Sequence, residues 1–118
     1  MILQLDHVSI IASSEATIRF YEKLGFKSQS CIDRGYDKLY YLTGYGITLE
    51  IYVDSNHPPR VDRPEAMGLR HLAFQVDDIE ESIKKWDIEA EPIRENNGYK
   101  FTFVRDPDLT PIELKELI

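Results

Sequence analysis

The sequence predicts an α+β fold in which a unit of one strand, one helix and three further strands occurs twice. Three observations lead to this prediction. In each half of the 118 residues, apolar residues follow the spacing of a strand, then of a helix, then of strands. A proline-rich stretch without apolar periodicity separates the halves, and the halves carry matching short segments. We therefore predict a single domain, residues 1–118, with modules at 1–54 and 68–118 and a linker at 55–67.

The first module is predicted to contain one helix and four strands. The helix is expected between candidate N-caps at Ser13 and Ser14 and a terminating Gly25. Its apolar face is formed by Ile18, Tyr21 and Leu24. The four strands are expected at Leu3–Ile11, Phe26–Ile32, Tyr36–Leu42 and Ile47–Val53, because these runs are rich in β-branched and aromatic residues and turn-forming residues separate them.

The second module repeats this order. Asp78, with Glu81 three residues later, is typical of a helix start. The apolar stripe of this helix is Ile79, Ile83 and Trp86. The four strands are expected at Leu69–Val76, Glu89–Arg94, Tyr99–Val104 and Pro111–Leu117.

Composition excludes several classes of partner. The formal net charge is −7 and the pI about 4.9, with acidic and basic residues interspersed. Nucleic acids and anionic membranes repel such a surface, so neither is an expected partner. The single cysteine, Cys31, cannot form an internal disulfide and fits a reducing compartment. The first residues have no basic region typical of a secretory signal, so we expect a cytoplasmic protein.

The two halves align at residues that can bind metal. An offset of 64 places LDHVSI (5–10) over LRHLAF (69–74) and superimposes His7 on His71. An offset of 63 places Glu50, in TLEIY (48–52), on Glu113, in IELKE (112–116). Each half therefore begins with a strand histidine and ends with a strand glutamate.

Paired histidines and glutamates on one sheet face predict a metal site. Side chains alternate along a strand, so His7, His71 and Glu50 share the face opposite the apolar neighbours that pack under the helices. A carboxylate on an inward face is costly unless a cation neutralises it. Two carboxylates and two imidazoles suit Zn²⁺, Ni²⁺, Co²⁺, Mn²⁺ or Fe²⁺. With six positions on the metal, two stay open for substrate oxygens, as in a Lewis-acid catalyst.

The sequence resembles the vicinal oxygen chelate superfamily, which includes glyoxalase I, fosfomycin-resistance proteins, extradiol dioxygenases and bleomycin-binding proteins. The resemblance covers essentially the whole chain and is closest to small bacterial glyoxalase-like proteins. It rests on LDHVSI, FYEKLGF (20–26), TLEIY, GLRHLAFQVDD (68–78) and FVRDPDLTPIEL (103–114). It implies two βαβββ modules whose curved mixed sheets surround one central metal cavity.

The resemblance also implies which residues do the chemistry. His7, Glu50, His71 and Glu113 fall on the metal-ligand positions, and the His/Glu/His/Glu pattern is that of glyoxalase I. The implied activity is that of a lactoylglutathione lyase-like enzyme, a lyase or isomerase acting on a hemithioacetal or other small α-hydroxycarbonyl by proton transfer through a metal-stabilised enediolate. A ligand glutamate acts as the base. Glu113 is the first choice and Glu50 the second.

Two positions depart from the family pattern. Glutathione-type members carry an arginine shortly after the first histidine, where this chain has Ile10 and Ile11, which argues against glutathione as the thiol. The usual glycine after Asp-Pro-Asp is replaced by Leu109, so the turn there is expected to differ.

Two other functions stay open at this point. One is a non-catalytic binding or resistance protein that sequesters a small molecule, and the other is a thiol transferase of the fosfomycin-resistance type. Arg60, Arg63, Arg70 and Lys100 could attract an anionic substrate, although pairing with Asp62 and Glu65 is the favoured interpretation. His57 is not expected to bind metal. We expect a homodimer, with the four ligands supplied by one chain or by two.

Overall fold

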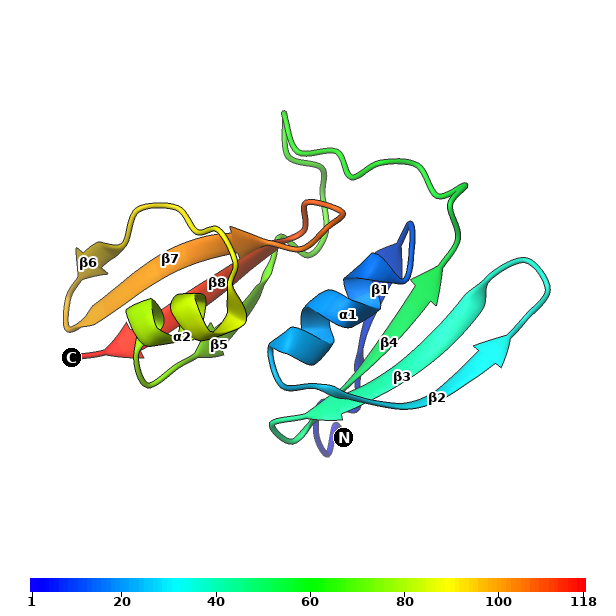
Figure 1. Ribbon diagram of the computed structural model, residues 1–118, viewed down its shortest axis with the longest axis horizontal. Coiled ribbons are helices and arrows are strands. Elements are labelled where there is room, and N and C mark those ends of the chain that lie inside the picture. The colour runs from blue at the N-terminus through cyan, green and yellow to red at the C-terminus, as the bar shows by residue number, and fades with distance from the viewer. The chain divides into compact units, whose positions relative to one another are not determined.

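The chain forms two compact units of the same architecture. The computed structural model describes residues 1–118, and the units are Met1–Pro58 and Pro59–Ile118. Each unit has one four-stranded mixed sheet and one helix (Figure 1). The predicted α+β fold of two tandem βαβββ modules is therefore confirmed.

The first unit contains one parallel and two antiparallel strand pairs. Its elements are β1 (Val8–Ala12), α1 (Ala16–Lys23), β2 (Lys27–Asp33), β3 (Lys38–Gly44) and β4 (Ile47–Val53). The strand order is β1-β4-β3-β2, and β1 runs parallel to β4. A parallel pair needs a long connection, which α1 and the β2–β3 hairpin supply. The first and last strands of the unit therefore lie side by side.

The second unit repeats this topology. Its elements are β5 (Leu72–Gln75), α2 (Ile79–Trp86), β6 (Arg94–Asn96), β7 (Tyr99–Arg105) and β8 (Pro111–Leu117). The strand order is β5-β8-β7-β6, with β5 parallel to β8. Neither α1 nor α2 has the length and apolar character needed to span a membrane.

Alternating burial assigns the two faces of each sheet as predicted. In β4, Leu49 and Ile51 are fully buried, whereas Glu50 lies partly exposed on the opposite face. In β8, Ile112 and Leu114 are fully buried and Glu113 is partly exposed. Because successive side chains point to opposite faces, the apolar neighbours fix each glutamate on the face away from the helix.

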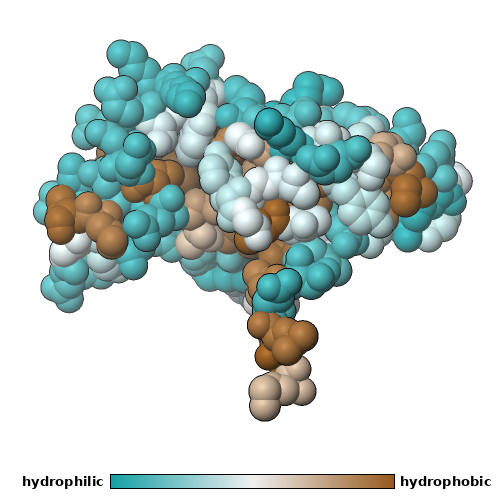
Figure 2. Space-filling view, turned by 90° about the horizontal axis from the view of Figure 1, so that it is seen from below, coloured by the Kyte–Doolittle hydropathy of each residue, from teal (hydrophilic) through white to brown (hydrophobic).

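The two histidines lie just before their strands, whereas the sequence predicted longer strands at Leu3–Ile11 and Leu69–Val76. Pairing starts at Val8 with Leu49 and at Leu72 with Ile112. In the second unit this register places His71 opposite Pro111, which has no backbone N–H to donate. In the first unit β4 extends to Ile47, two residues before Leu49, so pairing stops before the partner strand does. The apolar side chains at the N-terminus are instead exposed and form a projection with brown atoms in Figure 2.

The prediction of the weak strand Glu89–Arg94 was wrong. The observed strand, β6, starts at Arg94 and pairs antiparallel with β7 through a turn at Asn97 and Gly98. Glu91 donates one backbone hydrogen bond to Phe103. Pro92 has no N–H, so the ladder is not continued there.

The helix starts differ between the units. Asp78 caps α2 as predicted, since its carboxylate accepts the backbone N–H of Glu81 at 2.9 Å. Helix α1 instead has Glu15 at its cap position without a side-chain bond. Ser14, one of the two predicted caps, lies one residue before this position, yet its hydroxyl accepts the N–H of Ala16, the first residue of the helix, at 3.2 Å.

Candidate metal centre

The first unit brings His7 and Glu50 together. The parallel register of β1 and β4 places Ser9 opposite Glu50, so His7, two residues before Ser9, lies on the same face. The imidazole Nε2 lies 3.3 Å from Glu50 Oε2. The His7 side chain is 37% exposed and that of Glu50 is 15% exposed, so an ion or a small molecule can reach the pair.

Asp6 fixes the proton on His7. Its carboxylate lies 2.8 Å from His7 Nδ1, and a carboxylate can only accept, so Nδ1 carries the hydrogen. This hydrogen bond raises the pKa of His7 above its ordinary value, although partial burial opposes the shift, and the charges of Glu50 and Asp6 add to it. In the neutral ring, the Nε2 lone pair then faces Glu50.

A tyrosine holds the other oxygen of Glu50. Tyr52, two residues along β4, donates its hydroxyl to Glu50 Oε1 at 3.3 Å. Burial, and then the charge of Glu50, raises the pKa of Tyr52. The guanidinium of Arg34 stacks on the Tyr52 ring at 4.8 Å and forms two hydrogen bonds with Asp37, at 2.6 and 2.7 Å. Arg34 also lowers the pKa of Asp37 through these bonds. The carboxylate of Glu50 is thus supported by a second layer of side chains.

The second unit brings His71 and Glu113 together in the same way. The register of β5 and β8 places Ala73 opposite Glu113, two residues after His71. His71 Nε2 lies 3.1 Å from Glu113 Oε1. The ring of Phe103 packs edge-on against the imidazole, with 5.0 Å between the ring centroids. Both side chains of the pair stay partly accessible, at 23% and 20% exposure.

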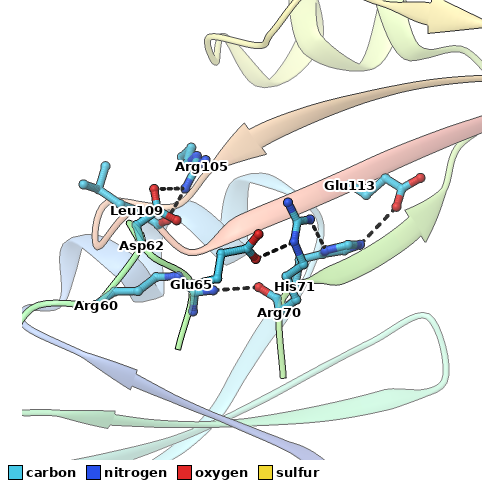
Figure 3. A network of polar contacts seen from close by, with 8 residues as sticks. All are labelled: Arg60, Asp62, Glu65, Arg70, His71, Arg105, Leu109 and Glu113. Carbon is cyan, nitrogen blue, oxygen red and sulfur yellow. Dashed lines mark hydrogen bonds and ion pairs between the residues drawn. The ribbon is translucent and has the colours of Figure 1, made fainter. Parts of the chain in front are cut away.

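The neighbour of His71 is a donor, unlike the neighbour of His7. Arg70 places Nη1 3.0 Å from His71 Nδ1 and donates through Nε to Glu65 at 2.6 Å (Figure 3). Arg60 donates to the backbone oxygen of Arg70 at 2.7 Å. Since arginine has no acceptor, Nδ1 of His71 must accept and the neutral ring carries its hydrogen on Nε2, toward Glu113.

The predicted ligands are therefore joined as one His–Glu pair in each unit. Neither unit by itself gathers three or more side chains that could hold a metal ion. A centre with all four ligands remains a prediction. The predicted pairing of the arginines with Asp62 and Glu65 is confirmed in part. Arg70 pairs with Glu65, whereas Asp62 Oδ2 lies 3.4 Å from Nη1 of Arg105. His57 belongs to neither pair, and its Nε2 is buried without a hydrogen-bond partner.

Three residues next to the pairs were not predicted to act on them: Asp6, Arg70 and Tyr52. A signal for the first two was present in the sequence, because the alignment that superimposes His7 on His71 also superimposes Asp6 on Arg70. Tyr52 could have been found from strand periodicity, since residues two apart on a strand share a face. Its hydroxyl contact with Glu50 depends on the side-chain conformation.

The donor set fits a divalent cation. In the first unit, a lone pair of His7 Nε2 and an oxygen of Glu50 face each other at 3.3 Å. Two acceptors in this position need a proton or a metal ion between them. One neutral imidazole nitrogen and one carboxylate oxygen are ligands of the first-row divalent metals.

The comparisons with known proteins agree with this fold and pattern. The family model of the Glyoxalase/Bleomycin resistance protein/Dioxygenase superfamily matches residues 4–114. The uncharacterized protein YwkD of Bacillus subtilis (strain 168) is 37% identical over 98% of this chain and 98% of its own length. The crystal structure of the glyoxalase family protein from Enterococcus faecalis is 43% identical, with a TM-score of 0.88 over 96% of this chain and 97% of that one.

A more distant structure shares the fold alone. The fosfomycin resistance protein FosX of Listeria monocytogenes, in its complex with Mn(II) and sulfate ion, is 17% identical, with a TM-score of 0.76 over 100% of this chain and 95% of that one. The match of the family model covers nearly the whole chain and includes both His–Glu pairs. The chain therefore belongs to the Glyoxalase/Bleomycin resistance protein/Dioxygenase superfamily.

Proposed function

We propose that this protein is a metal-dependent lyase or isomerase of the glyoxalase I type. Its substrate is a hemithioacetal or another small α-hydroxycarbonyl. The observation that supports this proposal is the repeated pair, in which a histidine ring nitrogen faces a glutamate oxygen at 3.3 Å in one unit and at 3.1 Å in the other. Two such pairs supply the His/Glu/His/Glu ligand set that the resemblance to glyoxalase I implies.

The proposed resident group is one divalent ion held by His7, Glu50, His71 and Glu113. When bound, it supplies Lewis-acid polarisation of the substrate oxygens. The Mn(II) complex of FosX supports a divalent metal on this fold. Whether one chain or a symmetric homodimer provides the four ligands is tested by the mass of the metal-loaded protein in solution.

The proton transfer is assigned to Glu113. A base has to take a proton from one carbon and return it to the neighbouring carbon, and it needs a carboxylate oxygen free to move. Tyr52 and Arg34 support Glu50, whereas the residue two positions after Glu113 is Lys115, whose ammonium lies 4.2 Å from the Tyr99 ring centroid. Apart from its contact with His71, Glu113 has no such support, and the less restrained carboxylate is the better base.

The thiol of the substrate is proposed to differ from glutathione. The position at which glutathione-type members carry an arginine is occupied by Ile10, which is buried, and Ile11, which is 55% exposed and apolar. Neither side chain can pair with a carboxylate of glutathione. A smaller thiol without that carboxylate would satisfy the site.

The proposal is tested by metal analysis and turnover together. The purified protein is expected to bind one divalent ion per four-ligand set and to convert methylglyoxal in the presence of at least one thiol from a panel that includes glutathione. His7→Ala and His71→Ala should lose the metal, whereas His57→Ala, at the third histidine, should keep it. Metal-free protein that binds a small molecule without turnover would instead support a sequestering protein. Transfer of the thiol to fosfomycin would support the third function.

A further inference from the structure

The proposed function places His7 and His71 on one metal ion, but the side chains next to the two rings hold them in opposite tautomers. His7 Nδ1 faces a carboxylate of Asp6 at 2.8 Å, and His71 Nδ1 faces the guanidinium of Arg70 at 3.0 Å. A carboxylate accepts and a guanidinium donates, so the rings are held in opposite tautomers. The nitrogen that faces the glutamate is therefore a free lone pair on His7 and an N–H on His71.

This difference matters because a histidine binds metal through a nitrogen that carries no proton. The usual second partner of a metal-bound imidazole is an acceptor that takes the hydrogen of the other ring nitrogen. Asp6 is such an acceptor, so His7 needs no rearrangement. Arg70 has the opposite effect, because its N–H groups can only donate. It prevents Nδ1 of His71 from carrying the hydrogen and places a positive charge next to the ring.

Other contacts hold Arg70 in this position. Glu65 accepts its Nε–H at 2.6 Å, and the Phe103 ring, which also contacts His71, lies 5.7 Å from the guanidinium carbon. Arg60 donates to the backbone oxygen of the same residue at 2.7 Å. Figure 3 shows the resulting chain of contacts from Glu65 through Arg70 and His71 to Glu113.

On the basis of the proposed function, we propose that Arg70 is a positioning residue that opposes metal binding at His71. Its guanidinium must move away from Nδ1 before the ion is bound. Asp6, in contrast, holds His7 in the tautomer that binds metal. In the metal-free second unit these contacts form a continuous series: Arg70 donates to Glu65 and His71, and His71 donates to Glu113. Binding an ion between His71 Nε2 and Glu113 breaks the last of these bonds and shifts the ring hydrogen to Nδ1. Glu65 keeps the displaced guanidinium neutralised.

The inference is tested first without any metal. Long-range ¹⁵N NMR of the histidine rings, at a pH well above the ordinary histidine range, distinguishes the two neutral tautomers. The metal-free protein is expected to carry the hydrogen on Nδ1 in His7 and on Nε2 in His71. In Arg70→Gln, the amide oxygen can accept, so the hydrogen of His71 should move to Nδ1. An Nδ1–H tautomer of His71 in the unmodified protein would overturn the inference.

The second test is a Co²⁺ titration followed by visible absorption. Arg70→Gln is expected to raise the Co²⁺ affinity by about 10- to 100-fold, the range in which outer partners of metal-bound histidines act. Arg60→Gln removes the same charge from the same cluster without touching the ring, so its affinity should stay within about threefold of the parent protein. Asp6→Ala should lower the affinity by about tenfold, and Asp6→Asn, which keeps an acceptor, should restore part of it.

The possible failures can be distinguished. Equal effects of Arg70→Gln and Arg60→Gln would overturn the role of the Arg70–His71 contact and leave the proposed function standing. If neither the parent protein nor any variant binds Co²⁺, the proposed function falls, and with it the part of this inference that concerns metal. Circular dichroism of each variant confirms that the fold is kept.

Discussion

The two units share a topology and a His–Glu pair but differ in how the pair is supported. In the first unit, Asp6 accepts from His7, and Tyr52 donates to Glu50. In the second, Arg70 donates to His71, and no tyrosine corresponds to Tyr52. A duplicated fold can therefore keep the ligand positions and still make the two halves chemically unequal, because the residues next to the ligands differ.

The units also differ in how their helices are packed. Helix α1 buries four residues, including Phe20 and Tyr21, whereas α2 buries Ile79 alone. Ile83 and Trp86, the rest of the apolar stripe of α2, are half-exposed within their unit. Since burial of apolar area stabilises a fold, the first unit has the larger hydrophobic core.

The largest expected effect separates the two glutamates. Glu113→Gln should lower kcat by about 1,000-fold, within the range for loss of a general base, because the amide cannot take a proton. Glu50→Gln should lower kcat by about tenfold, as expected for a supporting ligand. Steady-state kinetics of the metal-loaded variants measure both. Equal losses, or a larger loss in Glu50→Gln, would remove the proposed division of roles.

The packing difference predicts unequal losses of stability. Phe20→Ala should lower the free energy of unfolding by about 3–5 kcal/mol, because the ring leaves a cavity under the first sheet. Ile83→Ala, at the corresponding position of α2, should cost less than about 2 kcal/mol, since that side chain is already half-exposed. Urea unfolding measures the two values. Similar losses would show that α2 is as deeply packed as α1.

A smaller effect is expected from removing the support of Glu50. Tyr52→Phe deletes the hydroxyl that donates to Glu50 but keeps the ring on which Arg34 stacks. The Co²⁺ affinity should fall by about tenfold, the lower end of the range for such partners. Tyr36→Phe is the matched control, because this ring also stacks on Arg34 but is 69% exposed. If both variants lose the same affinity, the hydroxyl of Tyr52 does not position Glu50.

The smallest expected effect concerns the turns before the two glutamate strands. Gly46 has φ 77° in the first unit, and Leu109, 63 residues later, has φ 68° in the second. The expectation of a different turn at Leu109 is wrong as regards the backbone conformation, because Asp106 accepts the N–H groups of Asp108 and Thr110 and holds the loop. Leu109→Gly should raise the free energy of unfolding by up to about 1 kcal/mol, since a branched residue is strained there. Thermal unfolding measures the change, and a lower melting temperature would contradict it.

Much of the fold could be predicted because periodicity reports burial. The observed bounds were predicted for two strands, Ile47–Val53 and Pro111–Leu117, because apolar residues alternate along each of them and so share one buried face. The ends of Leu3–Ile11 and Leu69–Val76 could not be predicted in this way. They depend on where pairing with the partner strand begins, and that partner lies about 40 residues away in the chain.

The sequence by itself determined the repeat, the fold class and the alignment of His7 with His71 and of Glu50 with Glu113, because strand and helix periods and fixed offsets are local properties of the chain. The tertiary structure decided which ring nitrogen faces which neighbour: Asp6 on His7, Arg70 on His71 and Tyr52 on Glu50. These contacts depend on side-chain rotamers and strand register, which form only when distant strands pair. The physical reason is that a hydrogen bond has a direction, and the order of residues along the chain does not specify it.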